Sequence, residues 1–274
     1  MHRINTLRDS YHYSVLLLKE LVRTDFKLRY QNSVLGYVWS LLKPFSLFVI
    51  LYLVFVKVLG AGGDIPHFGT YLLIGIVVWN YFLEVTNGSI GAIVGKGDLL
   101  RKVNFPKYVI VLSGSFSALI NLAFNFIVIF IFMAIDNTEI SSAAIFSPLL
   151  IIELFVFSLA IAFFLSALFV KFRDISFIWE VAMQAAFFVT PIMYSFTFVS
   201  SKAPDWATKL IISNPLAQIM QDLRYLLVTP KTETVYTVFG SYIGYILPIA
   251  IVCLMALFSV VYFKKRSHFF AEDV

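Results

Sequence analysis

The chain has 274 residues, of which 60% are hydrophobic and 14% are charged, and its mean hydropathy is +0.87. Soluble domains carry roughly 25% charged residues, so this composition excludes a soluble globular protein and predicts an all-α protein embedded in a membrane. The net charge of +5 does not indicate nucleic-acid binding, because the cations lie at the ends of apolar segments. Cys253 is the only cysteine, which excludes a disulfide within the chain and a cysteine-based metal site.

A basic amphipathic segment precedes the first long apolar run. Between residues 13 and 30, apolar residues such as Val15, Leu18 and Val22 recur at helical spacing, with lysines and arginines between them. A helix with one apolar face and many cations lies in the membrane interface. We therefore expect residues 1–36 to form a cytoplasmic tail and an amphipathic interface helix, followed by a membrane domain over residues 37–263.

Six apolar segments are predicted to cross the membrane. They lie near residues 37–59, 70–90, 108–135, 148–170, 177–194 and 242–263. Fifteen lysines and arginines lie on the side of the N-terminal segment, the second and fourth connections and the tail at 264–274, and five lie on the opposite side. The positive-inside rule therefore predicts that both termini face the cytoplasm.

The second connection, residues 95–107, is strongly charged and reads GKGDLLRKVNFPK. Leu99 and Leu100 fall in a predicted short helix that ends before Pro106. Exposed leucines flanked by cations favour docking into a groove on a partner protein, whereas a solvated surface loop would explain the charges alone. We expect this segment to be a cytoplasmic coupling segment.

The fifth connection, residues 195–241, is too long for a simple turn. Residues 206–213 and 216–228 have the apolar pattern of two short helices, separated by Asn214 and Pro215. Short apolar helices broken by proline are typical of re-entrant or interfacial pieces. We expect them on the outer side of the membrane domain.

Two ionisable residues lie within the predicted spans, where charge is costly. Lys43 in the first span and Glu84 in the second each lie roughly two turns from the cytoplasmic boundary, so they could form an ion pair. Alternatively, Lys43 reaches the lipid headgroups and Glu84 faces a water-filled cavity. The centres of the third and sixth spans hold no ionisable residue, which argues against a proton-coupled carrier. The histidines lie outside the spans and far apart, so no metal site is expected.

Several segments together resemble the type-2 ABC transporter permeases that export polysaccharides, O-antigen and teichoic acids. They read LRYQNSVLGYVWSLLKP at 28–44, GDLLRKVNFP at 97–106, FRDI at 172–175, and TPIMY at 190–194 with Asn214–Pro215. The resemblance covers nearly the whole chain in the right order. It does not specify the cargo.

The resemblance implies a transport subunit rather than an enzyme, in a bacterial cytoplasmic membrane. Two copies of the chain would form a homodimer of six-span subunits with two copies of a cytoplasmic ATPase subunit. That partner would hold ATP and magnesium, and this chain would bind no cofactor. The implied cargo is a glycan on a polyprenyl diphosphate (an O-antigen, a capsule-like glycan, a rhamnan or a teichoic acid), moved from the inner to the outer leaflet.

The resemblance also implies roles for individual residues. The helix at 13–30 would lie at a lateral gate, where cations would hold the diphosphate of the lipid, although anionic headgroups could equally attract Arg29. The residues at this gate would be Lys27, Arg29, Tyr30, Trp39 and Lys43. The segment 95–107 would dock on the ATPase through Asp98, Leu99, Leu100, Arg101, Lys102 and Phe105.

Other functions fit part of the pattern. A stand-alone secondary carrier or channel would share the spans but would work without ATP. A membrane-embedded transferase for lipid-linked sugars would need clustered catalytic carboxylates or histidines, and Asp98, Asp174 and Glu180 are too close to basic residues to indicate one. A type-2 ABC drug exporter permease differs in its cargo, and the interface helix and the Asn–Pro pattern favour the glycan exporters.

Overall fold

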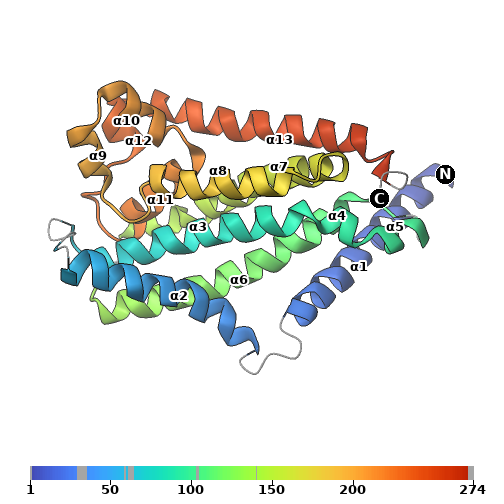
Figure 1. The fold of residues 1–274 in the computed structure, drawn as a ribbon, viewed down its shortest axis with the longest axis horizontal. Coiled ribbons are helices and arrows are strands. Elements are labelled where there is room, and N and C mark those ends of the chain that lie inside the picture. Colours follow the sequence, from blue (N-terminus) through green and yellow to red (C-terminus); the bar gives the residue numbers. More distant parts are fainter. Residues whose placement is uncertain are drawn as a thin grey trace.

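The computed structural model describes residues 2–29, 36–58, 60, 65–102, 105–139 and 141–270, and for residues 2–12, 26, 28, 29, 37 and 99 it describes the backbone alone. Every regular element in these ranges is a helix. The helices form an elongated bundle in which the first helix begins and the last helix ends at the same end of the molecule (Figure 1).

Five of the described helices are long and apolar enough to cross a membrane. They are Trp39–Val58 (α2, Trp39–Tyr52, continued by the π-helical turns Leu53–Val58), α3 (Phe68–Ile90), α6 (Tyr108–Ile135), Ser142–Lys171 (a 3₁₀ turn and α7, Ser147–Lys171) and Tyr242–Arg266 (a 3₁₀ turn and α13, Ile246–Arg266). They correspond to the first four predicted spans and the sixth. The chain is therefore a multi-pass membrane protein.

The fifth predicted span is shorter than expected. Helix α8 covers Ile175–Val189, a rise of only about 22 Å, whereas the hydrocarbon core of a bilayer is about 30 Å thick. The prediction that this helix continues to residue 194 is wrong, because proline disfavours the helical conformation of the residue before it. Thr190 is extended (φ −79°, ψ 134°), and the chain turns at Pro191.

Helix α3 is the centre of the bundle. It packs against α6 and α7 on one side, and α2 and α8 flank it on the other (Figure 1). Helix α13 packs against α7. Stacked rings of Phe82 and Phe157, 5.8 Å apart, join α3 to α7, and an edge-to-face pair of Phe163 and Phe263, 4.9 Å apart, joins α7 to α13. Aromatic contacts thus connect three of the long helices in a row.

Helix α1 (His2–Arg29) is the helix expected before the first span. It packs along α6, with Ser14 buried and Leu17 and Leu21 half-buried, whereas Val15 and Leu16 are exposed. The face that contacts the bundle is therefore rotated relative to the apolar face predicted through Val15. The exposed apolar side chains remain available to lipid.

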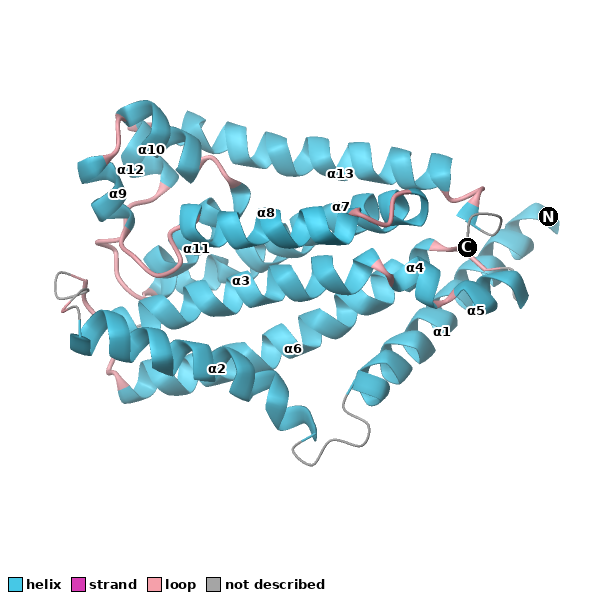
Figure 2. Ribbon diagram, in the orientation of Figure 1, coloured by secondary structure: helices cyan, strands magenta, loops and turns pink. Residues whose placement is uncertain are grey.

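Four short helices gather at the end of the bundle opposite to the termini (Figure 2). They are α9 (Phe196–Lys202), α10 (Asp205–Ile212), α11 (Pro215–Leu227) and α12 (Val235–Phe239). The two predicted helices are confirmed as α10 and α11. Asn214 caps α11 by accepting a hydrogen bond from the amide of Leu216 (3.1 Å), and Pro215 occupies the first helical position, where its missing N–H has no cost.

Helix α11 carries a fully buried arginine, Arg224, which is 0% exposed. Its Nε donates to the carbonyl of Tyr71 in α3 (3.0 Å), while Nη1 and Nη2 donate to the carbonyls of Pro191 (2.6 Å) and Ile192 (2.8 Å). Nη1 also donates to the side-chain oxygen of Gln221 (2.9 Å), and the guanidinium carbon lies 3.7 Å from the centre of the Tyr71 ring. Arg224 thus ties together α3, the turn after α8, and α11.

Gly75 on α3 makes room for this guanidinium. A β-carbon at position 75 would overlap with Nη2 of Arg224 and would lie 3.0 Å from the carbonyl oxygen of Ile192. Four hydrogen bonds hold the guanidinium in place, so Gly75→Ala is expected to destabilise the protein by about 1–3 kcal/mol through overpacking. The measurement is thermal unfolding of the purified chain in detergent.

Gly88 provides the matched control on the same helix, because no atom lies within 4 Å of a β-carbon placed there. Gly88→Ala is expected to leave stability unchanged or to raise it by up to about 1 kcal/mol through helix propensity. Equal melting temperatures for the two variants would contradict the packing around Arg224.

Candidate functional site

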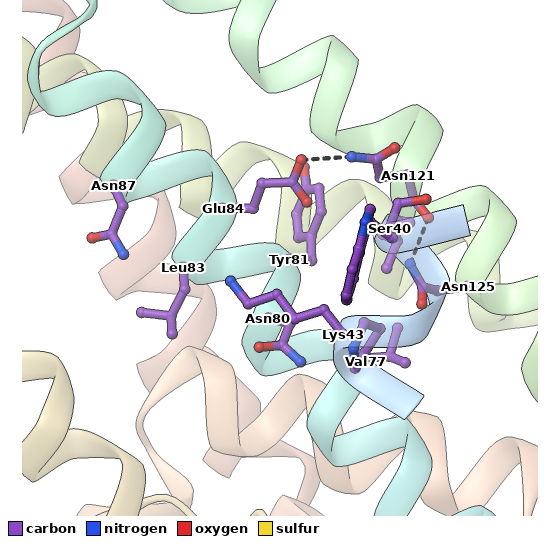
Figure 3. Close-up of a pocket in the computed structure, with 13 residues that line it drawn as sticks. Ser40, Lys43, Val77, Asn80, Tyr81, Leu83, Glu84, Asn87, Asn121 and Asn125 are labelled. Carbon is purple, nitrogen blue, oxygen red and sulfur yellow. Dashed lines mark hydrogen bonds between the residues drawn. The ribbon is translucent and has the colours of Figure 1, made fainter. Parts of the chain in front are cut away.

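A polar cavity of about 390 Å³ lies between α2, α3 and α6. Its polar lining comes from all three helices (Figure 3): Ser40, Lys43, Asn80, Tyr81, Glu84, Asn87, Asn121 and Asn125, with the indole of Trp39. Amides and charges are costly inside membrane helices and mark the paths of polar substrates. We take this cavity as the candidate functional site.

Helix α3 presents a polar stripe to the cavity, formed by Asn80, Glu84 and Asn87. These residues are four and three positions apart, so they lie on one face of the helix. Asn80 and Glu84 are half-buried and Asn87 is exposed. Of the three, only Glu84 is predicted as a functional residue from the sequence. The spacing of the two asparagines around it was the signal that could have revealed the stripe.

Helix α6 fixes the carboxylate of Glu84. Asn121 is buried, and its side-chain nitrogen donates to Glu84 Oε1 (2.7 Å). Asn125, one turn further, donates to the backbone carbonyl of Asn121 (2.8 Å) (Figure 3). Helix α6 therefore holds the carboxylate of Glu84 in a defined position at the cavity.

Lys43 and Glu84, predicted as an ion pair, line the same cavity. Figure 3 shows Lys43 reaching from α2 towards α3, while the carboxylate of Glu84 is turned towards Asn121. No ion pair between Lys43 and Glu84 occurs in the described structure, so their pairing stays a prediction. Trp39, predicted at the gate, is half-exposed in the same lining.

The stripe also borders a second hollow, of about 410 Å³, between α3 and α8. Asn87 lines both hollows, and α8 adds Glu180 and Gln184. Helix α8 has no buried residue among those described. The polar face of α3 therefore lies between two flanking helices, one of which packs only loosely.

The structure describes only some of the other residues that are predicted at the gate. Lys27 is exposed near the end of α1. The side chain of Arg29 and the whole of Tyr30 lie outside the described residues. The proposed contact of these cations with a diphosphate stays a prediction.

The predicted coupling segment, residues 95–107, contains the short helix α5 (Gly97–Lys102) and follows another short helix, α4 (Ala92–Gly95). Leu100 and Phe105 are only 8% and 6% exposed and belong to the main core. The expectation that Leu100 would be exposed for a partner is therefore wrong, because it anchors the segment to the bundle. The side chain of Leu99 lies outside the described part of the chain.

The exposed side of the coupling segment is charged: Asp98, Arg101 and Lys102 all face away from the core. Asp98 lies in the first turn of α5 and the two cations lie in its last turn, which matches the helix dipole. The segment therefore turns apolar side chains towards the bundle and charged side chains away from it.

An ion pair that the sequence analysis missed connects α1 to this segment. The ammonium of Lys96, between α4 and α5, lies 3.0 and 3.1 Å from the two carboxylate oxygens of Asp25 in α1. The hydroxyl of Ser113 in α6 donates to the same carboxylate (2.9 Å). Asp25 thus holds together α1, α6 and the start of α5.

Long apolar helices around a polar cavity, with charged short helices at one end, define a multi-pass membrane protein of the transporter class. Residues 17–228 match the ABC-2 type transporter family. The chain belongs to this family of membrane permeases, as its sequence motifs predicted.

The chain is similar to permeases named for O-antigen export. It is 28% identical over 99% of its length to the O-antigen export system permease protein RfbA of Myxococcus xanthus, all of which is covered. Two proteins of the same name from Klebsiella pneumoniae are each 26% identical, over 93% and 97% of this chain and 94% and 99% of their own lengths.

The half-buried contact of Asp25 with Lys96 leads to a stability prediction. Asp25→Ala removes two charge-assisted hydrogen bonds and leaves Lys96 without its carboxylate, so we expect a loss of about 1–3 kcal/mol. Glu20→Ala, an exposed position on the same helix, is the control and should change stability by less than about 0.5 kcal/mol. Thermal unfolding in detergent checks both, and equal effects would contradict the role of Asp25.

Proposed function

We propose that this chain is the membrane-spanning subunit of an ATP-driven exporter that moves a polysaccharide, linked to a polyprenyl diphosphate, from the inner to the outer leaflet of a bacterial cytoplasmic membrane. The observation that carries the proposal is the amide-rich cavity between α2, α3 and α6. Amides both donate and accept hydrogen bonds, which suits a cargo rich in hydroxyl groups. The names of the similar permeases support the same cargo class.

The lipid diphosphate would meet the cations of α1 and α2. Lys27 is exposed near the end of α1, and Lys43 lines the cavity at the start of α2. Cations at headgroup level attract phosphate, and the glycan behind it would pass along the stripe of α3. In this proposal Arg29, Tyr30 and Trp39 complete the same gate.

The proposed assembly is a homodimer with two cytoplasmic ATPase subunits, and each subunit crosses the membrane six times with both termini inside. The loosely packed α8 and the adjacent stripe would face the second copy, so that the cargo path lies between subunits. The exposed charges of α5 would contact the ATPase. Asp25 in α1 binds Lys96 in the coupling segment. A movement of the coupling segment, driven by the ATPase, would therefore also move α1.

Removing polar groups from the stripe is expected to reduce export. Asn80→Leu and Glu84→Gln each remove one hydrogen-bonding or charged group from the cavity. We expect each change to weaken the stabilisation of the cargo during transport by about 1.4 kcal/mol, which lowers the export rate about tenfold. The assay measures surface polysaccharide in a strain that depends on the plasmid-borne gene, at equal amounts of chain in the membrane. Phe124→Leu, on an exposed position of α6 that does not line the cavity, is the control. Unchanged export in both cavity variants would overturn the assignment of this cavity.

Reversing the charges of α5 is expected to uncouple the subunits. Arg101→Glu with Lys102→Glu should lower substrate-stimulated ATP hydrolysis of the assembled transporter about tenfold or more, because these exposed cations would face the ATPase. Lys264→Glu with Lys265→Glu makes the same change of net charge on exposed residues at the same end of the molecule. Equal effects of the two double variants would contradict a specific contact through α5.

The alternative function, a stand-alone carrier that works without ATP, is tested in the same strain. An ATPase subunit that binds but cannot hydrolyse ATP should abolish export if the proposal is right. Continued export with that subunit would favour a carrier that works without ATP.

A further inference from the structure

The chain folds back on itself after the last long helix. Helix α13 ends at Arg266, the next residues form a turn, and Phe270 is only 1% exposed. Its ring packs edge to face on the ring of Phe263, with 5.3 Å between the ring centres. The described end of the chain is therefore packed against the last two turns of α13.

The coupling segment is bound to this end of α13, which lies at the same end of the molecule as α5 (Figure 1). Lys107 is the last residue of the segment, and its ammonium donates to the backbone carbonyl of Ser267, the residue that caps α13. The same ammonium lies 5.9 Å from the centre of the Phe270 ring. A lysine at the last carbonyls of a helix is favoured by the helix dipole. The segment is thus held at its start by α1, through Lys96, and at its end by α13.

The other end of α13 is bound to the short helices. Tyr245 lies in the 3₁₀ turn Tyr242–Tyr245 that leads into α13, and its hydroxyl donates to Asp222 Oδ1 in α11 (2.9 Å). Asp222 is buried, and its Oδ2 accepts from the side-chain nitrogen of Gln218 (2.8 Å). Helix α11 also carries Arg224, which binds the turn after α8. A displacement of the start of α13 would therefore act on the helix that holds this turn.

Helix α13 joins these two contacts. Tyr245 and Ser267 lie about 33 Å apart along the helix, at a rise of about 1.5 Å per residue. The ring of Phe164 in α7 packs against Phe258 (5.6 Å) and Tyr262 (5.5 Å) of α13, which supports the helix between its ends. We infer that α13 transmits movement of the coupling segment to α11, with Lys107 and Tyr245 as positioning residues at its two ends.

This inference rests on the proposed function, and two small changes test it. Lys107→Met removes the ammonium, and Tyr245→Phe removes one hydroxyl. Two quantities are measured for the transporter assembled with its ATPase subunit: ATP hydrolysis after purification, and glycan export at equal amounts of chain in the membrane. Each variant is expected to lower export about fivefold while ATP hydrolysis stays within about twofold of the parent's, because the lost hydrogen bond belongs to the link and not to the ATPase.

Each change has a matched control. Lys107→Arg keeps a cationic donor at the same position and should export as the parent does. Tyr242→Phe removes a hydroxyl from the same 3₁₀ turn as Tyr245, but Tyr242 is 74% exposed, so its export should also be unchanged. A change that only damages the fold would lower ATP hydrolysis and export together.

The double variant, Lys107→Met with Tyr245→Phe, tests whether the two contacts belong to one path. The effects of two distant, independent sites on a rate multiply, which would lower export about 25-fold. If α13 links the two contacts, the loss of either one already breaks the path, and the double variant should stay about fivefold below the parent.

The outcomes separate the role of α13 from the proposed function. Multiplied effects in the double variant, unchanged export in either single variant, or a proportional fall of ATP hydrolysis and export would overturn the role of α13 and leave the proposed function intact. Loss of export with continued ATP hydrolysis in both single variants, and no further loss in the double variant, would support it. A parent transporter that hydrolyses ATP but exports no glycan would contradict the proposed function, and with it the role of α13.

Discussion

A guanidinium removed from water needs hydrogen-bond acceptors for its N–H groups, and the end of the bundle opposite to the termini is arranged around that need. Arg224 is surrounded by neutral acceptors: the carbonyls of Tyr71, Pro191 and Ile192 and the side chain of Gln221. The carbonyls at 191 and 192 are available because the helix has ended at the proline. The early end of α8 therefore frees the carbonyl acceptors that allow α11 to be buried together with its arginine.

Helix α3 connects the two cavities. Its start borders a cavity of about 850 Å³ at the end of the bundle opposite to the termini, through Phe68 and Tyr71, and its middle carries the polar stripe that begins at Asn80. Nine residues of helix, about 14 Å, separate Tyr71 from Asn80. Helix α3 therefore contributes amides to one cavity and aromatic rings to the other.

Sequence patterns predicted the helical class, the family and the ends of most spans, because hydropathy and proline are local signals. Counting residues from the cytoplasmic boundary also placed Lys43 and Glu84 at similar depth, and both line the same cavity. The sequence patterns did not reveal the contact of Asp25 with Lys96 or the burial of Arg224 and Leu100. Arg224 lies in the long fifth connection, outside the predicted spans, and its main acceptors are backbone carbonyls far away in sequence. Every residue has a backbone carbonyl, so the amino-acid sequence does not show which carbonyls will accept hydrogen bonds from a buried arginine.

The order of the chain has a consequence for how the protein is made. The acceptors of α3 and of the turn after α8 precede Arg224 in the sequence, and proteins are synthesised from the N-terminus. When α11 is synthesised, Tyr71, Pro191 and Ile192 are already part of the chain. We therefore expect the docking of α11, with its guanidinium, to be a late step in the folding of this protein.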